Sequence, residues 1–132
     1  MERPRVLLVD DTPEIIRYYA EILNADAYEI VGTAPNAAVA LGMVAETAPQ
    51  VILLDISMPG MSGIELATRL RAGGCKALII FVSSDDALAA DAMSAGGSAY
   101  VSKNLIASDL QFAIREALAG RSFVSLWPGH RP

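Results

Sequence analysis

The residues best suited to chemistry in this sequence are aspartates that close two apolar runs. Asp10 and Asp11 directly follow residues 6–9 (Val-Leu-Leu-Val), and Asp55 directly follows residues 51–54 (Val-Ile-Leu-Leu). Three carboxylates in one crevice repel one another and raise one another's pKa unless a cation lies among them. Oxygen ligands without nitrogen or sulfur favour Mg²⁺, which keeps several waters and accepts few carboxylates. We therefore expect a divalent cation at these acids.

A serine and a lysine follow two later apolar segments. Ser83 closes residues 77–82, and Lys103 comes shortly after a fifth apolar segment. An ammonium and a hydroxyl together suit a tetrahedral anion better than a neutral ligand. A carboxylate can act as a nucleophile toward phosphorus, and Asp55, on the middle strand, is best placed to do so. These residue types indicate Mg²⁺-assisted aspartyl-phosphate chemistry, in which positioning and charge neutralisation dominate.

The elements that must position these side chains alternate along the chain. Continuous apolar runs of this length are typical of strands buried on both faces of a parallel sheet. We predict strands over residues 5–10, 28–33, 51–55, 77–82 and around 100–101, and helices over residues 12–23, 36–47, 64–71, 85–95 and 108–118. Five successive β/α units predict a doubly wound α/β fold, with the site residues at the carboxyl edge of its sheet.

Local signals sharpen some boundaries. Thr12 is predicted to be the N-cap of the first helix, with proline at the first helical position. Ser108 and Gln111 have the spacing of a capping box, so the last helix is expected to begin there. In the alanine-rich helix over residues 36–47, Val39, Met43 and Val44 are expected to face inward.

Composition limits the class of protein. The chain has 132 residues, of which 53% are hydrophobic and 19% charged, which fits one folded domain and argues against disorder. A net charge of −5 argues against direct nucleic-acid binding by this chain. No apolar run approaches the length of a membrane span, so we expect no membrane association and a cytoplasmic location.

The end of the chain differs from the rest. We predict one domain over residues 1–120 and a C-terminal extension over residues 121–132, the start of a linker or a tail. Phe123, Val124 and Trp127 make this extension too apolar for a free tail. We expect part of it to pack back onto the domain or to pair with a partner.

Four motifs, in their order along the chain, resemble the receiver domain of two-component response regulators. The motifs are Val-Leu-Leu-Val-Asp-Asp (6–11), Leu-Asp-Ile-Ser-Met-Pro-Gly-Met-Ser-Gly (54–63), Phe-Val-Ser (81–83) and Ala-Tyr-Val-Ser-Lys (99–103). Residues 29–34 and 120–125 are similar to the NarL/LuxR-type subgroup. The resemblance implies a (βα)5 flavodoxin-like receiver fold with five strands in the order 2-1-3-4-5.

The resemblance also implies roles for the acids. Asp55 would be the phosphoacceptor, modified by a partner histidine kinase or phosphotransfer protein. Asp10, Asp11 and Asp55, with the backbone carbonyl of Ser57, would hold Mg²⁺. Such a domain is a signalling switch, with at most self-phosphorylation and autodephosphorylation activity.

The remaining site residues would read the phosphoryl group. Ser83 and Lys103 would contact its oxygens, and Tyr100 would be an aromatic switch that turns inward when Ser83 moves. The switch would control an output protein or domain, including transcription regulation through a missing or separate effector. We expect a monomer or a phosphorylation-dependent homodimer.

Two other functions share part of this residue pattern. A haloacid-dehalogenase-type phosphohydrolase also places a nucleophilic Asp after a parallel strand, but it usually has a second acid two residues later, where this chain has Ser57. A degenerate receiver would bind proteins without phosphorylation. The intact set of Asp10, Asp11, Asp55, Ser83 and Lys103 favours an active receiver over both.

Overall fold

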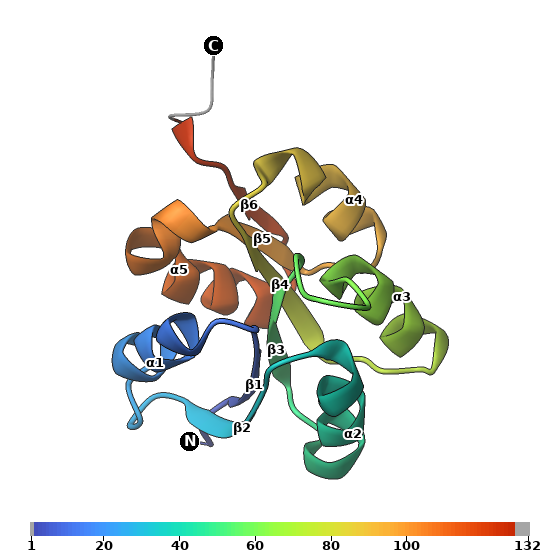
Figure 1. The fold of residues 1–132 in the computed structure, drawn as a ribbon. Coiled ribbons are helices and arrows are strands. Elements are labelled where there is room, and N and C mark those ends of the chain that lie inside the picture. The colour runs from blue at the N-terminus through green and yellow to red at the C-terminus, as the bar shows by residue number, and fades with distance from the viewer. Residues whose placement is uncertain (1, 129–132) are drawn as a thin grey trace.

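The computed structural model describes residues 2–128, in which strands and helices alternate (Figure 1). The strands are β1 (Arg5–Val9), β2 (Glu29–Ala34), β3 (Val51–Asp55), β4 (Leu78–Ser83), β5 (Ala99–Ser102) and β6 (Phe123–Ser125). The helices are α1 (Pro13–Ile22), α2 (Ala37–Thr47), α3 (Gly63–Ala72), α4 (Ala89–Ser94) and α5 (Ile106–Leu118), with short 3-10 turns η1 (Asp86–Leu88) and η2 (Lys103–Leu105).

The strands form one parallel sheet in the order β2-β1-β3-β4-β5-β6. The predicted doubly wound parallel fold is therefore confirmed, but the count of five strands is wrong. The sixth strand comes from the C-terminal segment, whose Phe123 pairs with Ala99 of β5. Pairing covers the outer edge of β5, which would otherwise leave its backbone groups open to water. Part of the extension thus packs back onto the domain.

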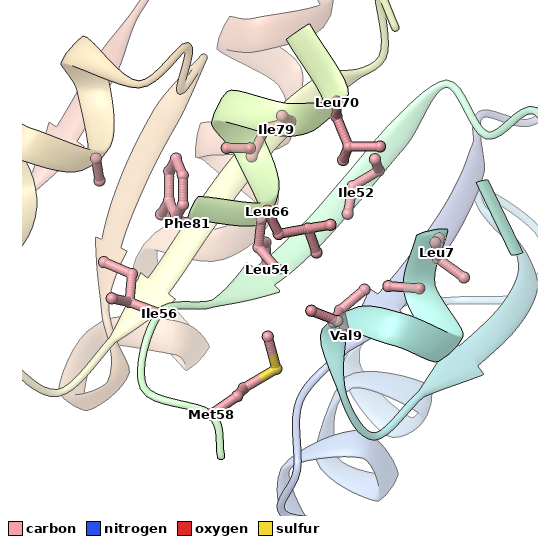
Figure 2. Close-up of a cluster of buried hydrophobic side chains, with 14 of the residues drawn as sticks. Leu7, Val9, Ile52, Leu54, Ile56, Met58, Leu66, Leu70, Ile79 and Phe81 are labelled. Carbon is pink, nitrogen blue, oxygen red and sulfur yellow. The ribbon is translucent and has the colours of Figure 1, made fainter. Parts of the chain in front are cut away.

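Helices cover both faces of the sheet (Figure 1). Buried residues of α2, α3 and α4 pack on one face, and those of α1 and α5 pack on the other. Figure 2 shows the first of these clusters, in which Leu54 and Phe81 of the central strands lie beneath Leu66 of α3. None of the helices in the described part of the chain has the length and apolar character needed to cross a bilayer.

The predictions for the first two helices differ in outcome. Thr12 occupies the N-cap position of α1 as predicted, but its side chain makes no capping bond. In α2, Met43 and Val44 pack partly buried against the core as predicted, but Val39 is 42% exposed and the fully buried positions are Ala37 and Ala40. The small side chains face the sheet because α2 packs close to it, and this close packing leaves the larger Val39 outside.

The predicted start of α5 is also wrong. The helix begins at Ile106, two residues before the proposed capping box. The Ser108 hydroxyl donates to the carbonyl of Leu105, and Gln111 donates its side-chain amide to Ile22 at the end of α1. Ile106 is 2% exposed, so starting the helix earlier buries an apolar side chain that a helix from Ser108 would leave in a loop.

The loop after β3 closes tightly onto the strand that carries Asp55. The Gly63 amide donates to the carbonyl of Ile56 at 2.8 Å, and the Ser62 hydroxyl accepts from the Glu65 amide and caps α3. A Cβ on Gly63 would lie 2.1 Å from the carbonyl oxygen of Asp55. Glycine is therefore required here because the backbones of the loop and the strand touch.

Substituting Gly63 with alanine should destabilise the protein strongly. The clash is with backbone, which cannot rotate away, so we expect a loss of at least about 2 kcal/mol in the free energy of unfolding. The matched control is Gly42→Ala, at an exposed position of α2 with no atom near the added Cβ. It should raise stability by up to about 1 kcal/mol. Urea unfolding measures both, and equal effects at the two positions would contradict the tight closure.

Candidate functional site

Three aspartates meet at the carboxyl edge of the sheet. Asp10 and Asp11 follow β1, Asp55 ends β3, and one carboxylate oxygen of each lies within 4.8 Å of the others. Asp10 and Asp55 are each 2% exposed, whereas Asp11 is exposed. β1 and β3 are hydrogen-bonded neighbours, so their last residues come side by side without any contribution from a loop.

Backbone amides and one lysine stabilise these carboxylates. Asp10 accepts from the Thr12 amide at 2.9 Å, and Asp55 accepts from the Ser57 amide at 3.3 Å. The Lys103 ammonium lies 3.2 Å from Asp10 Oδ2 and 3.4 Å from Asp55 Oδ1, so it bridges the two buried acids. One ammonium faces three carboxylates, which leaves the cluster with excess negative charge when all three are ionised.

This imbalance is expressed in the pKa of Asp55. Burial and the neighbouring Asp10 raise the pKa of Asp55 to about 6, against the opposing effects of Lys103 and the Ser57 amide. Burial is the largest cause because a carboxylate loses its hydration among apolar strands. A group with such a pKa is sensitive to any added positive charge.

The donor set fits a divalent cation. Asp10 Oδ2 is buried and, within the described residues, accepts no hydrogen bond, although the Lys103 ammonium is nearby. A hollow of about 340 Å³ opens beside Asp10 and Asp11. A hard cation with bound waters would coordinate such carboxylate oxygens and offset the excess charge, as Mg²⁺ does in all-oxygen sites. A larger hollow, about 760 Å³, lies at the opposite edge near Pro49 and Leu78 and contains none of these residues.

Ser83 and Tyr100 form a second group beside the acids. Ser83 ends β4, is 1% exposed, and its hydroxyl accepts from the Asp85 amide at 3.1 Å. Tyr100 is fully buried, and its hydroxyl contacts the carbonyls of Ser83 at 3.4 Å and Asp85 at 3.1 Å. The tyrosine thus already lies inward, bonded to the loop after β4, and no bond joins Ser83 to the acids among the described contacts.

Ser57 was predicted as a site residue, whereas Asp86 was not predicted but contacts Tyr100. Ser57, predicted as a metal ligand through its carbonyl, is exposed and contributes its amide to Asp55. Asp86 was not singled out from the sequence, yet its carboxylate accepts from the Tyr100 hydroxyl at 2.9 Å. The only available signal was an acid in the loop after β4, which is too common to indicate a contact.

Fold and site together match a known family. The family model for the response regulator receiver domain matches residues 6–115, and the chain belongs to this family. The similarity to NarL and to LuxR-family regulators confirms the predicted subgroup.

Individual relatives give the extent of the similarity. The chain is 43% identical over 104 residues to a protein-glutamate methylesterase/protein-glutamine glutaminase of Nocardioides sp., covering 75% of this chain and 28% of that protein. It is 35% identical to the DNA-binding transcriptional activator DevR/DosR of Mycobacterium tuberculosis, covering 91% of this chain and 57% of the relative. The chain therefore covers about a quarter of the first relative and a little more than half of the second. A LuxR-family response regulator from Aurantimonas sp. has a TM-score of 0.86 and 31% identity, over 97% of this chain and 92% of that one.

The raised pKa of Asp55 predicts a pH-dependent stability difference. Between pH 3.8 and about 6 the carboxyl ionises in the unfolded chain before it does so in the folded one, so the native state loses stability as pH rises through this window. Asp55→Asn removes the ionisation and should be more stable than wild type by about 2 to 3 kcal/mol at pH 7.5 without divalent cations.

The advantage of Asp55→Asn should shrink toward pH 4 and stay constant above about pH 7. Chemical unfolding across this range measures it, with Asp26→Asn, at an exposed turn position, as the control of equal charge change. A difference that is constant from pH 4 to 8 would contradict the assigned shift.

Proposed function

We propose that this chain is a phosphorylation-controlled switch in a two-component pathway, with Asp55 as the phosphoacceptor. The observation that carries the proposal is the buried Asp55 carboxylate, which shares Lys103 with Asp10 inside a three-acid cluster. Residues 1–120 would form the receiver domain and residues 121–132 the start of a linker or tail. Residues 129–132 lie outside the described part of the chain.

In the transfer step, the Asp55 carboxylate would be the nucleophile. An Asp55 oxygen forms a bond to the phosphorus of a phosphohistidine on a partner kinase or phosphotransfer protein. The phosphorus–nitrogen bond breaks, and the imidazole leaves with its electron pair and takes up a proton. The product is an acyl phosphate on Asp55. Its later hydrolysis by water, assisted by the same site, would be the only other activity of the chain.

Asp10, Asp11 and Asp55 would hold Mg²⁺, with the carbonyl of Ser57 as a further ligand. The cation supplies charge neutralisation for the phosphoryl oxygens. Asp10 contributes the buried oxygen that accepts no hydrogen bond within the described residues, and Asp11 contributes an exposed carboxylate beside it. Asp55 keeps its second oxygen for the phosphoryl group.

The phosphoryl group would then reorganise the positive and polar side chains. Lys103 already lies between Asp10 and Asp55, so a small movement would bring its ammonium onto a phosphoryl oxygen. The Ser83 hydroxyl would donate to another oxygen, and Tyr100 would follow the loop that Ser83 begins. A shift from mostly off to mostly on requires about 5 kcal/mol, which several charge-assisted contacts supply together.

The output is proposed from the relatives. DevR/DosR is a DNA-binding transcriptional activator, and we propose that this switch controls transcription through an effector domain or protein. The net charge of −5 supports control through an effector over direct contact with nucleic acid. We further propose that the protein acts in the cytoplasm, away from membranes, as a monomer or as a phosphorylation-dependent homodimer.

Incubation with Mg²⁺ and a small phosphodonor such as acetyl phosphate should add one phosphoryl group to the wild-type chain. Asp55→Asn should gain none, because the amide is not a nucleophile toward phosphorus. Intact mass measures the gain, and chelation of Mg²⁺ should abolish it. Asp26→Asn is the control and should gain the group like wild type. Equal gains in wild type and Asp55→Asn would place the acceptor elsewhere.

A further inference from the structure

The C-terminal segment returns to the sheet and is held there at several points. β6 pairs with β5 from Phe123 to Ser125 and thereby lies along the edge of the strand that carries Tyr100. The Phe123 ring packs edge-on against Phe112 of α5, with centroids 5.0 Å apart. The buried Ser125 hydroxyl donates to Asp109 of α5. This segment is therefore docked by side-chain contacts as well as by strand pairing.

Beyond β6, the chain reaches the loop that follows β4. The Trp127 amide donates to Asp86 Oδ2 at 2.7 Å. The other oxygen of the same carboxylate, Oδ1, accepts from the Tyr100 hydroxyl at 2.9 Å. A single side chain thus joins the buried tyrosine of β5 to the docked end of the chain.

These contacts begin at Ser83, which ends β4 at the same edge of the sheet as the acids. The Ser83 hydroxyl accepts from the Asp85 amide, and the Tyr100 hydroxyl contacts the carbonyls of both residues. From there Asp86 continues to Trp127. Any movement of Ser83 toward a group on Asp55 changes the loop to which Tyr100 and Asp86 are bonded.

We propose that residues Phe123–Trp127 form a latch whose docking is coupled through Asp86 to the buried position of Tyr100. Each of the two bonds fixes the Asp86 carboxylate where the other needs it, so the docked latch and the inward tyrosine stabilise each other. This coupling is reciprocal: the inward tyrosine favours the docked latch by the same factor by which the docked latch favours the inward tyrosine. Asp86 is the positioning residue between them.

The proposal rests on the proposed function for its signal, since phosphorylation of Asp55 is what would bias Tyr100. Phosphorylation should then tighten the latch. The docked latch presents Val124, Leu126 and Trp127 at the surface, each between 37% and 48% exposed. Tightening would fix this apolar surface in one arrangement.

The Trp127 amide reports on the latch directly, because its own proton makes the bond to Asp86. Hydrogen exchange of this amide should be about tenfold faster in Asp86→Ala than in wild type. Asp86→Asn keeps one acceptor oxygen and should be intermediate. Asp91→Ala, which removes an exposed acid from α4, is the matched control and should exchange like wild type. Fluorescence of Trp127, the single tryptophan, gives a second readout.

Coupling is tested by adding Mg²⁺ and beryllofluoride, which mimics a phosphoryl group on a carboxylate. Exchange at Trp127 should slow at least about fivefold in wild type and in Asp91→Ala. Tyr100→Phe keeps the ring and loses the hydroxyl, so it should show no slowing, and neither should Asp86→Ala. A purely structural role of Asp86 would change the basal rate and leave the response intact, which would overturn the coupling.

The two proposals fail separately. If intact mass shows no phosphoryl group on Asp55, the proposed function is overturned. Docking of the latch is then tested in the unmodified protein. Equal rates of hydrogen exchange at the Trp127 amide in wild type and Asp86→Ala would overturn it. If Asp55 is modified and wild-type exchange does not slow, the phosphorylation-coupled latch is overturned and the proposed function stands.

Discussion

The ion pairs of Lys103 with Asp10 and Asp55 are the interaction on which this end of the molecule depends. Parallel strands bring the two acids together inside an apolar sheet, where neither hydration nor the single ammonium fully stabilises them. The raised pKa of Asp55 is the consequence. The site is therefore arranged to gain from added positive charge, and to hold an anionic group only when such charge is present. The proposed cation binding and phosphoryl transfer both rest on this one charge imbalance.

Tyr100 links this site to the rest of the molecule. It is fully buried, so its hydroxyl must find partners, and it finds them on the loop after β4. The loop in turn meets the end of the chain at Asp86. A short path of hydrogen bonds thus runs from Ser83, at the end of β4, through Tyr100 of β5 and Asp86 to the segment after β6.

Sequence patterns predicted the parts of the fold that depend on apolar runs. Residues 51–54 belong to β3 and are buried on both faces of the sheet, as their unbroken apolar character indicated. The predictions that were wrong depend on neighbours distant in sequence. Ser108 does not cap α5, since burial of Ile106 outweighs a local capping bond. Val39 faces outward because α2 approaches the sheet with alanines. Predicting the sixth strand would have required knowing that the edge of β5 was open for pairing.

By itself the sequence determined which residues lie at the ends of the strands. Because parallel strands carry their last residues to the same edge of the sheet, these residues gather there. They are Asp10, Asp11, Asp55, Ser83 and Lys103. Only the tertiary structure decided how Lys103 divides between two acids, that Tyr100 lies inward, and that Asp86 holds both its hydroxyl and the Trp127 amide. Strand direction is encoded locally in apolar runs. Contacts between a loop and a chain end depend on packing between distant segments, for which a sequence carries no periodic signal.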